Sequence, residues 1–348
     1  MANKTQQTSG NVTVPEHARK ALQAREVGNF LSNYAIIIII SIMVLAVGFS
    51  KPNFWTLDNG KNLIINIAPR FIIAAGVSGC LITKGTDLSA GRLVGLSACV
   101  AATVLQEVGY GARFFPNMPD LPVIVGLLIA VAITALFGMI NGMVIAWLKV
   151  PPFIATLGMQ TIVYGICQIY TGNDPQGGLK DSYKAVANGS LFGVIPYLFL
   201  FALVVGVFMW LLYNKTRHGK YMYAIGGNEI AAEVSGVNTK KAKILIYMTA
   251  GIMYAMAGYL LAAKSGGASA SMGNGYELEA IAGCTIGGVS TTGGIGTIGG
   301  VLVGVLVFEF LKIVLQFLGV NPYYNYMVQG IVIVTAVALD IRKYIAKK

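Results

Sequence analysis

The stretch NKTRHGKYMYAIGGNEIAAEVSGVNTKKAK, residues Asn214–Lys243, decides the fold because it is the longest polar segment between two apolar runs. Residues 191–213 before it carry no charged side chain, and residues 244–263 after it carry none either. Each run is long enough to supply the roughly 20 apolar residues that cross a bilayer as a helix. The sequence therefore predicts two membrane-spanning helices joined by a substantial water-exposed segment.

The composition extends this prediction to the whole chain. Of its 348 residues, 55% are hydrophobic and only 11% are charged, and the mean hydropathy is +0.69. Soluble domains carry about 25% charged residues. The 43 glycines also fit helices that pack closely in lipid. We therefore expect an all-α polytopic membrane protein in contact with lipid. Its net charge of +11 marks loops and chain ends rather than a nucleic-acid surface.

Apolar runs recur along the chain and predict about ten transmembrane helices. They lie at 31–49, 62–83, 89–108, 122–148, 152–171, 191–213, 243–263, 278–290, 297–318 and 324–341. The run at 278–290 is too short to cross alone. No small-residue cleavage site follows the first run, so we expect an uncleaved span. The predicted organisation is a flexible cytoplasmic tail (1–30), one transmembrane domain (31–342) and a basic cytoplasmic tail (343–348).

The basic residues predict the orientation, because cytoplasmic loops are enriched in Lys and Arg. They cluster before the first run, after the last run and within the 214–243 segment. These residues are Arg19, Lys20, Arg25, Lys215, Arg217, Lys220, Lys240, Lys241, Lys243, Arg342, Lys343, Lys347 and Lys348. We therefore expect both termini and the 214–243 segment on the cytoplasmic side.

Two halves of five helices would then run in opposite directions, which is the arrangement of an inverted repeat. A short sequence similarity between the halves favours such a repeat, because DLSA (87–90) follows the second run and ELEA (277–280) follows the seventh. Glycine pairs four residues apart allow close helix approach in lipid. They occur at Gly91/Gly95, Gly138/Gly142, Gly283/Gly287 and Gly300/Gly304. We expect most of them to pack inside the protein, and one of them could serve a dimer face.

Motifs of soluble enzymes are absent or out of context. GIGTIG (294–299) matches the dinucleotide pattern GxGxxG, but that motif needs a preceding strand and a βαβ unit. Membrane spans flank it here, so we interpret it as a helix break with close packing. The chain has no GxxxxGK[ST], HExxH or GxSxG pattern, and its four cysteines stand singly in apolar runs. We therefore expect no catalytic residues, no metal and no cofactor.

Charged residues within apolar runs need polar surroundings, because a charge facing lipid is costly. Arg70, in the second run, either faces a polar interior or marks a helix break after Pro69. Glu309 and Lys312 stand three residues apart on one helix, which favours an internal ion pair. The polar run TKGTDLSAGR (83–92) is either a cytoplasmic turn that caps the next helix or a re-entrant segment that lines a polar cavity.

The 214–243 segment contains the signals of a short helix. Gly227 or Asn228 can cap a helix that begins at Glu229, and Gly236 can end it after Ser235. Ala231 and Ala232 would give this helix a smooth flank, suited to a groove on a partner protein. The alternative is a merely solvated connector.

Five stretches of this chain resemble permease subunits of ATP-binding-cassette sugar importers of the ribose/xylose/galactoside family. They are TKGTDLSAGR (83–92), ING (140–142) with PFIATLG (152–158), YAIGGNEIAA (223–232), SGV (235–237) and the segment from GGVS (287–290) to the glycines at 299–300. The resemblance extends over nearly the whole chain after residue 60. The motif TDLSAGR (86–92), together with NPYYNY (321–326) and VALD (337–340), is most similar to the family members that carry galactose and methyl galactosides.

The resemblance implies a non-enzymatic, multi-pass subunit of the bacterial inner (plasma) membrane. Its implied partners are a second copy of itself, cytoplasmic ATP-binding subunits and an extracytoplasmic sugar-binding protein. It assigns ATPase coupling to Gly227, Asn228, Glu229, Ala231, Ala232, Ser235 and Gly236. Polar residues that could line the sugar pathway are Thr86, Asp87, Ser89, Asn141 and Thr156, with Phe153 as a possible stacking aromatic. The alternative function is an ion-coupled secondary transporter, which would need a paired acid and base in mid-membrane.

Overall fold

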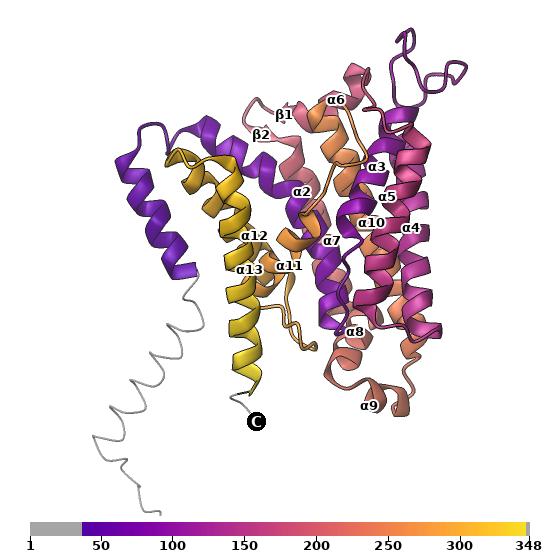
Figure 1. Cartoon of the computed structure of the whole chain (residues 1–348), viewed down its shortest axis with the longest axis vertical. Coiled ribbons are helices and arrows are strands. Elements are labelled where there is room, and N and C mark those ends of the chain that lie inside the picture. Colours follow the sequence, from indigo (N-terminus) through magenta and orange to yellow (C-terminus); the bar gives the residue numbers. More distant parts are fainter. Residues whose placement is uncertain (1–36, 346–348) are drawn as a thin grey trace, which may run out of the picture.

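The computed structural model describes residues 37–345, and helices make up most of this part of the chain (Figure 1). The predicted tail at 1–30 and the last three residues lie outside the described residues. The elements are a helix at Ile37–Ser50, α2 (Leu57–Ile82), α3 (Ala90–Val104), α4 (Val123–Trp147), α5 (Pro152–Thr171), α6 (Asp181–Asn188), β1 (Ser190–Leu191), β2 (Ile195–Pro196), α7 (Tyr197–Lys215), α8 (Arg217–Gly227), α9 (Glu229–Val234), α10 (Thr239–Ser265), α11 (Tyr276–Ile286), α12 (Ile298–Phe317) and α13 (Pro322–Ile345).

Six of the described helices are long and apolar enough to cross a membrane, namely α2, α4, α5, α7, α10 and α12. Shorter apolar helices occupy Ile37–Ser50, α3 and the Tyr326–Ala338 part of α13. Each of the ten predicted runs overlaps one helix, and α11, in the run expected to be too short, has 11 residues. The polytopic all-α class is therefore confirmed.

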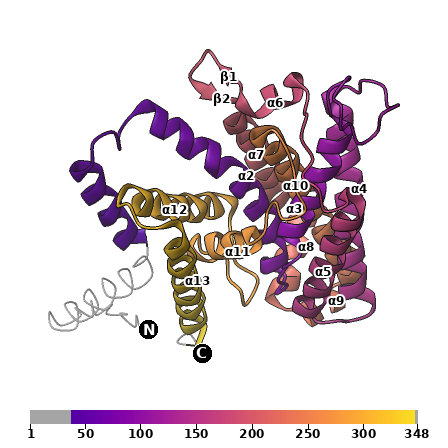
Figure 2. The ribbon, with the colours of Figure 1, turned by 45° about the horizontal axis from the view of Figure 1, so that its top comes forward.

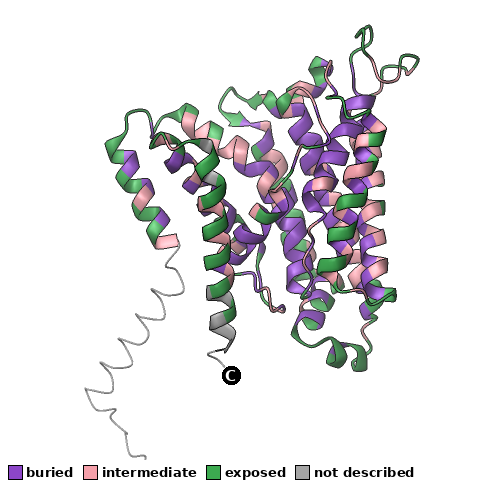
Figure 3. Ribbon diagram, in the orientation of Figure 1, coloured by how far each residue is buried: buried purple, intermediate pink, exposed green. Residues whose placement is uncertain are grey.

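The centre of the bundle consists of α2, α3 and α10. The most apolar stretch of α2 is 72% buried and that of α10 is 67% buried, against 22% for α4, α5 and α7. Figure 3 shows the same division, with buried residues in the middle and exposed residues on the peripheral helices. The exposed apolar faces of α4, α5 and α7 are what a lipid-facing helix requires.

Helix approach in the bundle relies on glycine. A Cβ atom added at Gly138 of α4 would lie well under 3.0 Å from the carbonyl oxygen of Tyr247 in α10. The predicted pairs on α11 and α12 meet each other, because a Cβ at Gly304 would collide with the Gly283 carbonyl and one at Gly287 with the Gly300 carbonyl. All four predicted glycine pairs contact other parts of the same chain, as expected for internal packing.

A second, smaller hydrophobic core lies to one side of the main bundle (Figure 2). It joins the Ile37–Ser50 helix to α12 and α13 through buried residues such as Val44 and Val314. Phe54, in the turn before α2, stacks edge-on against Phe317 at the end of α12, with ring centroids 5.0 Å apart. These contacts place the end of α12 beside the beginning of α2.

The segments between the spans lie at two opposite ends of the molecule. Figure 1 shows α8 and α9 at one end, together with the end of α13, and α6, β1 and β2 at the other. Between α10 and α11 the chain turns back along α3, where a Cβ at Gly95 would lie under 3.0 Å from the carbonyl of Met272. As a result α11 begins beside α3 rather than at an end of the bundle.

Candidate coupling surface and polar sites between the spans

The short helix predicted within 214–243 is present as α9, preceded by α8. The Asn228 side chain accepts the backbone N–H of Ala231 (3.1 Å), so Asn228 rather than Gly227 is the cap. Gly236, at φ 87°, allows the N–H of Val237 to reach the carbonyl of Ala232 (3.0 Å) and end the helix. The predicted boundaries of this helix are confirmed.

The outward face of α9 differs in part from the predicted alanine flank, because only one of the two alanines is exposed. Ala232 is 5% exposed and packs inward with Ile225 and Ala242. Ala231 is exposed, and the bulky apolar side chains that project into solvent are Ile230 and Val234, at 76% and 85% exposure. They stand four residues apart, so they form one apolar patch on the helix. The signal for this patch is present in the sequence, because Ile230 and Val234 are the only two bulky apolar residues between Glu229 and Ser235.

Glu229, the first residue of α9, pairs with Lys243 in the first turns of α10. The Lys243 Nζ lies 2.7 Å from one carboxylate oxygen of Glu229. Because the Glu229 side chain is 45% exposed, this pair orients α9 more than it stabilises the fold. Glu229 is therefore held toward the spans rather than presented freely to a partner.

The segment before α9 is bonded to two turns between spans. Lys84, in the turn after α2, donates its ammonium to the carbonyl of Gly227 (3.3 Å). Tyr223 of α8 donates its hydroxyl to the carbonyl of Gly296, in the loop before α12 (2.7 Å). These two turns are also bonded to each other, since Gly294 donates its N–H to the carbonyl of Ile82 (2.8 Å). We call the three segments 82–84, 223–227 and 293–296 the joint.

The GIGTIG segment belongs to this joint. Gly293 and Gly294 have φ values of 88° and 78°, in the left-handed region that favours glycine. No βαβ unit surrounds the motif, since the described strands are two residues long and α12 begins at Ile298. Its interpretation as a helix break with close packing is confirmed.

Five of the six predicted pathway residues come together between α2, α3, α4 and α5. Asp87 accepts the N–H and the hydroxyl of Ser89 (3.0 and 2.6 Å) and the hydroxyl of Tyr254 (3.1 Å). Asn141 of α4 donates its amide to the Ser89 hydroxyl (2.9 Å). The hydroxyl of Thr156 accepts the N–H of Leu88 (3.1 Å) and lies 3.0 Å from the carbonyl of Thr86.

This network is buried, with Asp87, Ser89, Asn141 and Thr156 at 0% exposure. Phe153 is not part of it, because its side chain is 56% exposed on the first turn of α5. In this conformation the network holds the turn between α2 and α3 against the neighbouring helices. Lys84 of the same turn is exposed and bonded to Gly227, so the turn lies at the α9 end of the molecule. The side chains of Asp87 and Ser89 point inward.

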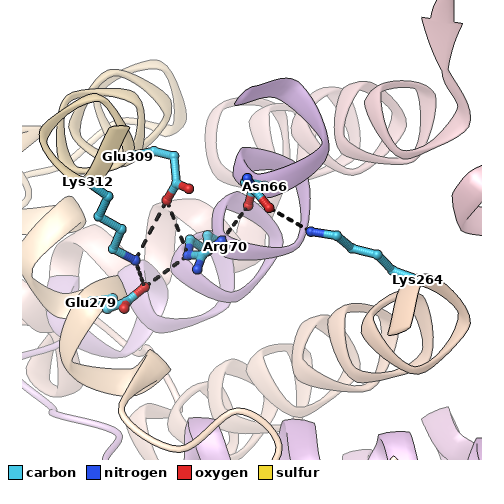
Figure 4. Close-up of polar contacts among 6 residues, drawn as sticks. All are labelled: Asn66, Arg70, Lys264, Glu279, Glu309 and Lys312. Atoms are coloured by element: carbon cyan, nitrogen blue, oxygen red, sulfur yellow. Dashed lines mark hydrogen bonds and ion pairs between the residues drawn. The ribbon is translucent and has the colours of Figure 1, made fainter. Parts of the chain in front are cut away.

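A second polar cluster surrounds Arg70. Helix α2 continues through Pro69, so Arg70 marks no helix break but faces a polar interior. Its Nε lies 3.0 Å from Glu279 of α11 and 3.3 Å from Glu309 of α12. Lys312 pairs with Glu279 (2.6 Å) and with Glu309 (3.7 Å), so the predicted Glu309–Lys312 pair is part of a four-residue network (Figure 4).

The cluster continues toward the end of the molecule that carries α6. Arg70 donates from Nη1 to the backbone carbonyl of Asn66 (3.0 Å), one helical turn before it. The Asn66 side chain accepts the ammonium of Lys264, near the end of α10 (2.6 Å). Glu279 and Lys264 lie on α11 and α10, so no local pattern in the sequence connects them with Arg70, whereas Asn66 precedes Arg70 by one turn of α2.

No group of three or more His, Cys, Asp or Glu side chains that could hold a metal ion occurs in residues 37–345. All four cysteines are buried thiols.

Comparisons with known proteins show that the chain is similar to permease components of transport systems. Residues 60–337 match the family described as branched-chain amino acid transport system / permease component. The galactose/methyl galactoside import permease protein of Escherichia coli K12 is 43% identical over 334 residues, which cover 94% of this chain and 99% of that protein. The protein of the same name from Haemophilus influenzae is 43% identical over 335 residues, with the same two coverages. The ribose import permease protein of E. coli K12 is 34% identical over 311 residues, or 88% of this chain and 93% of that protein. No solved structure gives a significant match.

Proposed function

This chain belongs to the branched-chain amino acid transport system / permease component family, and on that premise we propose that it is the permease subunit of an ATP-driven importer of galactose and methyl galactosides. The observation that carries the proposal is 43% identity to a galactose/methyl galactoside permease over 99% of that protein's length. The ribose permease, at 34% identity, is a more distant relative. The sugar would cross by alternating access between the spans.

The energy would come from separate ATP-binding subunits, because the chain contains no GxxxxGK[ST] motif. We place their docking surface on α9, where Ile230 and Val234 form an exposed apolar patch beside the Glu229–Lys243 pair. The family's coupling positions Gly227, Asn228, Ala231, Ser235 and Gly236 then shape and cap the helix. Closure of the ATP-binding subunits would push α9, and the joint would pass this movement to the turns after α2 and before α12.

The proposed topology has ten spans, with both termini and α9 in the cytoplasm of a bacterium and α6, β1 and β2 outside. The basic residues of α8 and of the start of α10, on either side of α9, support this orientation. The end of α13 on the α9 side also supports it (Figure 1). The importer would contain two copies of this chain, and an extracytoplasmic binding protein would deliver the sugar to the outer side. The binding protein would then supply most of the affinity.

The alternative function is an ion-coupled secondary transporter, which needs a paired acid and base among its spans. The Arg70 cluster is the feature that could meet this need. In this cluster two cationic and two carboxylate side chains balance one another within 3.7 Å. A balanced network has no excess carboxylate to carry a coupling proton. Together with the family membership, this makes the ATP-driven function the better supported of the two.

Uptake by the assembled importer in proteoliposomes tests the proposal. The permease, its ATP-binding subunits and its binding protein are reconstituted, and uptake of labelled galactose, methyl galactoside and ribose is measured with and without internal ATP. We expect ATP-dependent uptake of galactose and methyl galactoside, faster than that of ribose and unaffected by a protonophore. Uptake that needs no ATP and stops with the protonophore would establish the secondary transporter instead.

A further inference from the structure

The charged cluster around Arg70 lies between the middle of the membrane spans and their outer ends. Arg70 stands near the centre of the 26-residue helix α2. Glu309 and Lys312 precede the outer end of α12, Phe317, by eight and five residues, or about 12 and 8 Å at the rise of an α-helix. Charged groups at this depth are costly in contact with lipid and usually mark a substrate or ion path.

The side chains of the cluster are only partly enclosed. The side chains of Arg70, Glu279 and Lys312 keep 20%, 14% and 15% of their surface exposed. The buried oxygen Oε2 of Glu309 has no hydrogen-bond partner, although Arg70 Nε approaches it to 3.3 Å. Lipid cannot satisfy such groups, so the surface that they reach must meet water, substrate or protein.

An aromatic wall completes the cluster. Arg70 lies over the ring of Tyr276, 5.2 Å from its centroid, and Phe308 of α12 lines the same small pocket. Tyr276 is the first residue of α11, a short helix that begins where the chain has turned back along α3. Transporters commonly build their substrate sites from such discontinuous helices within the membrane.

We propose that Arg70, Tyr276, Glu279 and Glu309 form a sugar-binding station on the outer half of the translocation path. This inference rests on the proposed function. Sugar hydroxyls both donate and accept hydrogen bonds, so adjacent carboxylates and a guanidinium can hold neighbouring hydroxyls of one ring. The apolar face of the sugar would pack on Tyr276, as aromatic side chains do in most small-molecule sites. The row Arg70–Asn66–Lys264 leads from this station toward the outer surface (Figure 4).

In the present conformation the station is closed. The pocket lined by Arg70, Tyr276, Glu279 and Phe308 measures about 10 Å³, which is the lower limit for one water molecule. The ion pairs join α2 to α11 and α12, so separation of these helices would both open the pocket and free the charged groups. Sugar hydroxyls would then replace the interhelical ion pairs. This exchange gives each charged group either an ion-pair partner or a sugar hydroxyl, so that neither state carries an unpaired buried charge.

Two sets of variants test the station in the reconstituted importer. The first compares Tyr276→Leu, which removes the ring, with Tyr276→Phe, which keeps it. The second is the double variant Arg70→Met/Glu309→Gln, which removes one charge of each sign and leaves the Glu279–Lys312 pair intact. The matched control is Asp181→Asn/Lys184→Gln, which removes an exposed ion pair on α6. Initial uptake of galactose is measured over a range of concentrations of sugar-loaded binding protein.

We expect Tyr276→Leu and the Arg70/Glu309 double variant to lower the maximal uptake rate by about tenfold, the effect of losing one charge-assisted hydrogen bond or one well-packed contact. The half-saturating concentration should change little, because the binding protein captures the sugar. Tyr276→Phe keeps the ring and should therefore lose less uptake than Tyr276→Leu. The α6 control should remain near wild type. Co-purification with the ATP-binding subunits verifies assembly. If the double variant does not assemble, the comparison of Tyr276→Leu with Tyr276→Phe tests the station by itself.

If the Tyr276→Leu variant took up galactose at the wild-type rate, the proposed station would be wrong. The same holds if the double variant assembled and transported normally. A purely structural ion network predicts both of these results. Wild-type importer that takes up none of the tested sugars would instead overturn the proposed function, and the station with it. The two failures are therefore distinguishable.

Discussion

Gly294 donates its backbone N–H to the carbonyl oxygen of Ile82 over 2.8 Å, which fastens the loop before α12 to the end of α2. Gly226, three residues before α9, lies against both atoms, because a Cβ there would come well under 3.0 Å from each. In the proposed function, a push on α9 would therefore reach two turns that belong to opposite halves of the chain. The bond gives the proposed coupling helix a direct mechanical connection to the spans.

The first prediction concerns this joint. Gly226→Ala should force the three segments apart, because the clashing atoms are backbone and cannot rotate away. We expect the importer to assemble and hydrolyse ATP while sugar uptake falls by about tenfold, a loss of about 1.4 kcal/mol of coupling. Gly227→Ala is the matched control, since no atom lies within 4 Å of a Cβ at Gly227. Equal uptake by the two variants would remove the joint from the coupling path.

A second prediction addresses the docking surface on α9. Ile230→Asp and Val234→Asp should each weaken binding of the ATP-binding subunits by at least about tenfold, because burying such a side chain contributes about 1.5–3 kcal/mol. Co-purification of the subunits from detergent measures this. Phe192→Asp on the opposite end of the molecule, where Phe192 is 88% exposed, is the control for an added surface charge. Full retention of the subunits by both α9 variants would place the docking surface elsewhere.

The buried carboxylate of Asp87 leads to a third prediction, on stability. Asp87→Ala should leave the N–H and hydroxyl of Ser89 and the hydroxyl of Tyr254 without their acceptor, at a cost of about 2–3 kcal/mol or more. Asp87→Asn keeps an acceptor oxygen and should cost about 1 kcal/mol. Thermal unfolding of the purified permease, followed by size-exclusion chromatography, ranks the variants. If the Asp87→Ala variant were as stable as wild type but transported no sugar, the carboxylate would act in the sugar pathway rather than stabilise the turn between α2 and α3.

The fourth prediction tests the contact between α11 and α12. Gly304→Val should prevent folding of the inserted permease, because even a Cβ there would overlap the Gly283 carbonyl. Gly299→Ala on the same helix meets no atom within 4 Å and should raise stability by up to about 1 kcal/mol through helix propensity. The yield of monodisperse protein in mild detergent distinguishes them. A well-folded Gly304→Val variant would mean that α12 can move away from α11 at little cost.

Local patterns in the sequence were sufficient for several features. Twenty-residue apolar runs predict spans because lipid offers no partner for backbone N–H and C=O groups, so each run must form a helix. The Asn228 cap and the Gly236 stop of α9 follow from side-chain and backbone preferences within a few residues. Asp87, Ser89, Asn141 and Thr156 were predicted to line the sugar pathway together with Phe153. The structure holds the four in one buried network and leaves Phe153 outside it, and their role in transport stays a prediction.

The partners of each charged residue were decided only by the tertiary structure. Arg70 could face a polar interior or mark a break, and only the packing of α2 against α11 and α12 places Glu279 and Glu309 beside it. The outward face of α9 likewise depends on which side packs against α8 and α10, so Ala232 turned inward and Ile230 outward. By itself the sequence determined a polytopic permease with a capped short helix between two spans, because helix formation and membrane insertion are local. Long-range contacts between helices decided where its charges meet, since each apolar run leaves many packing partners open.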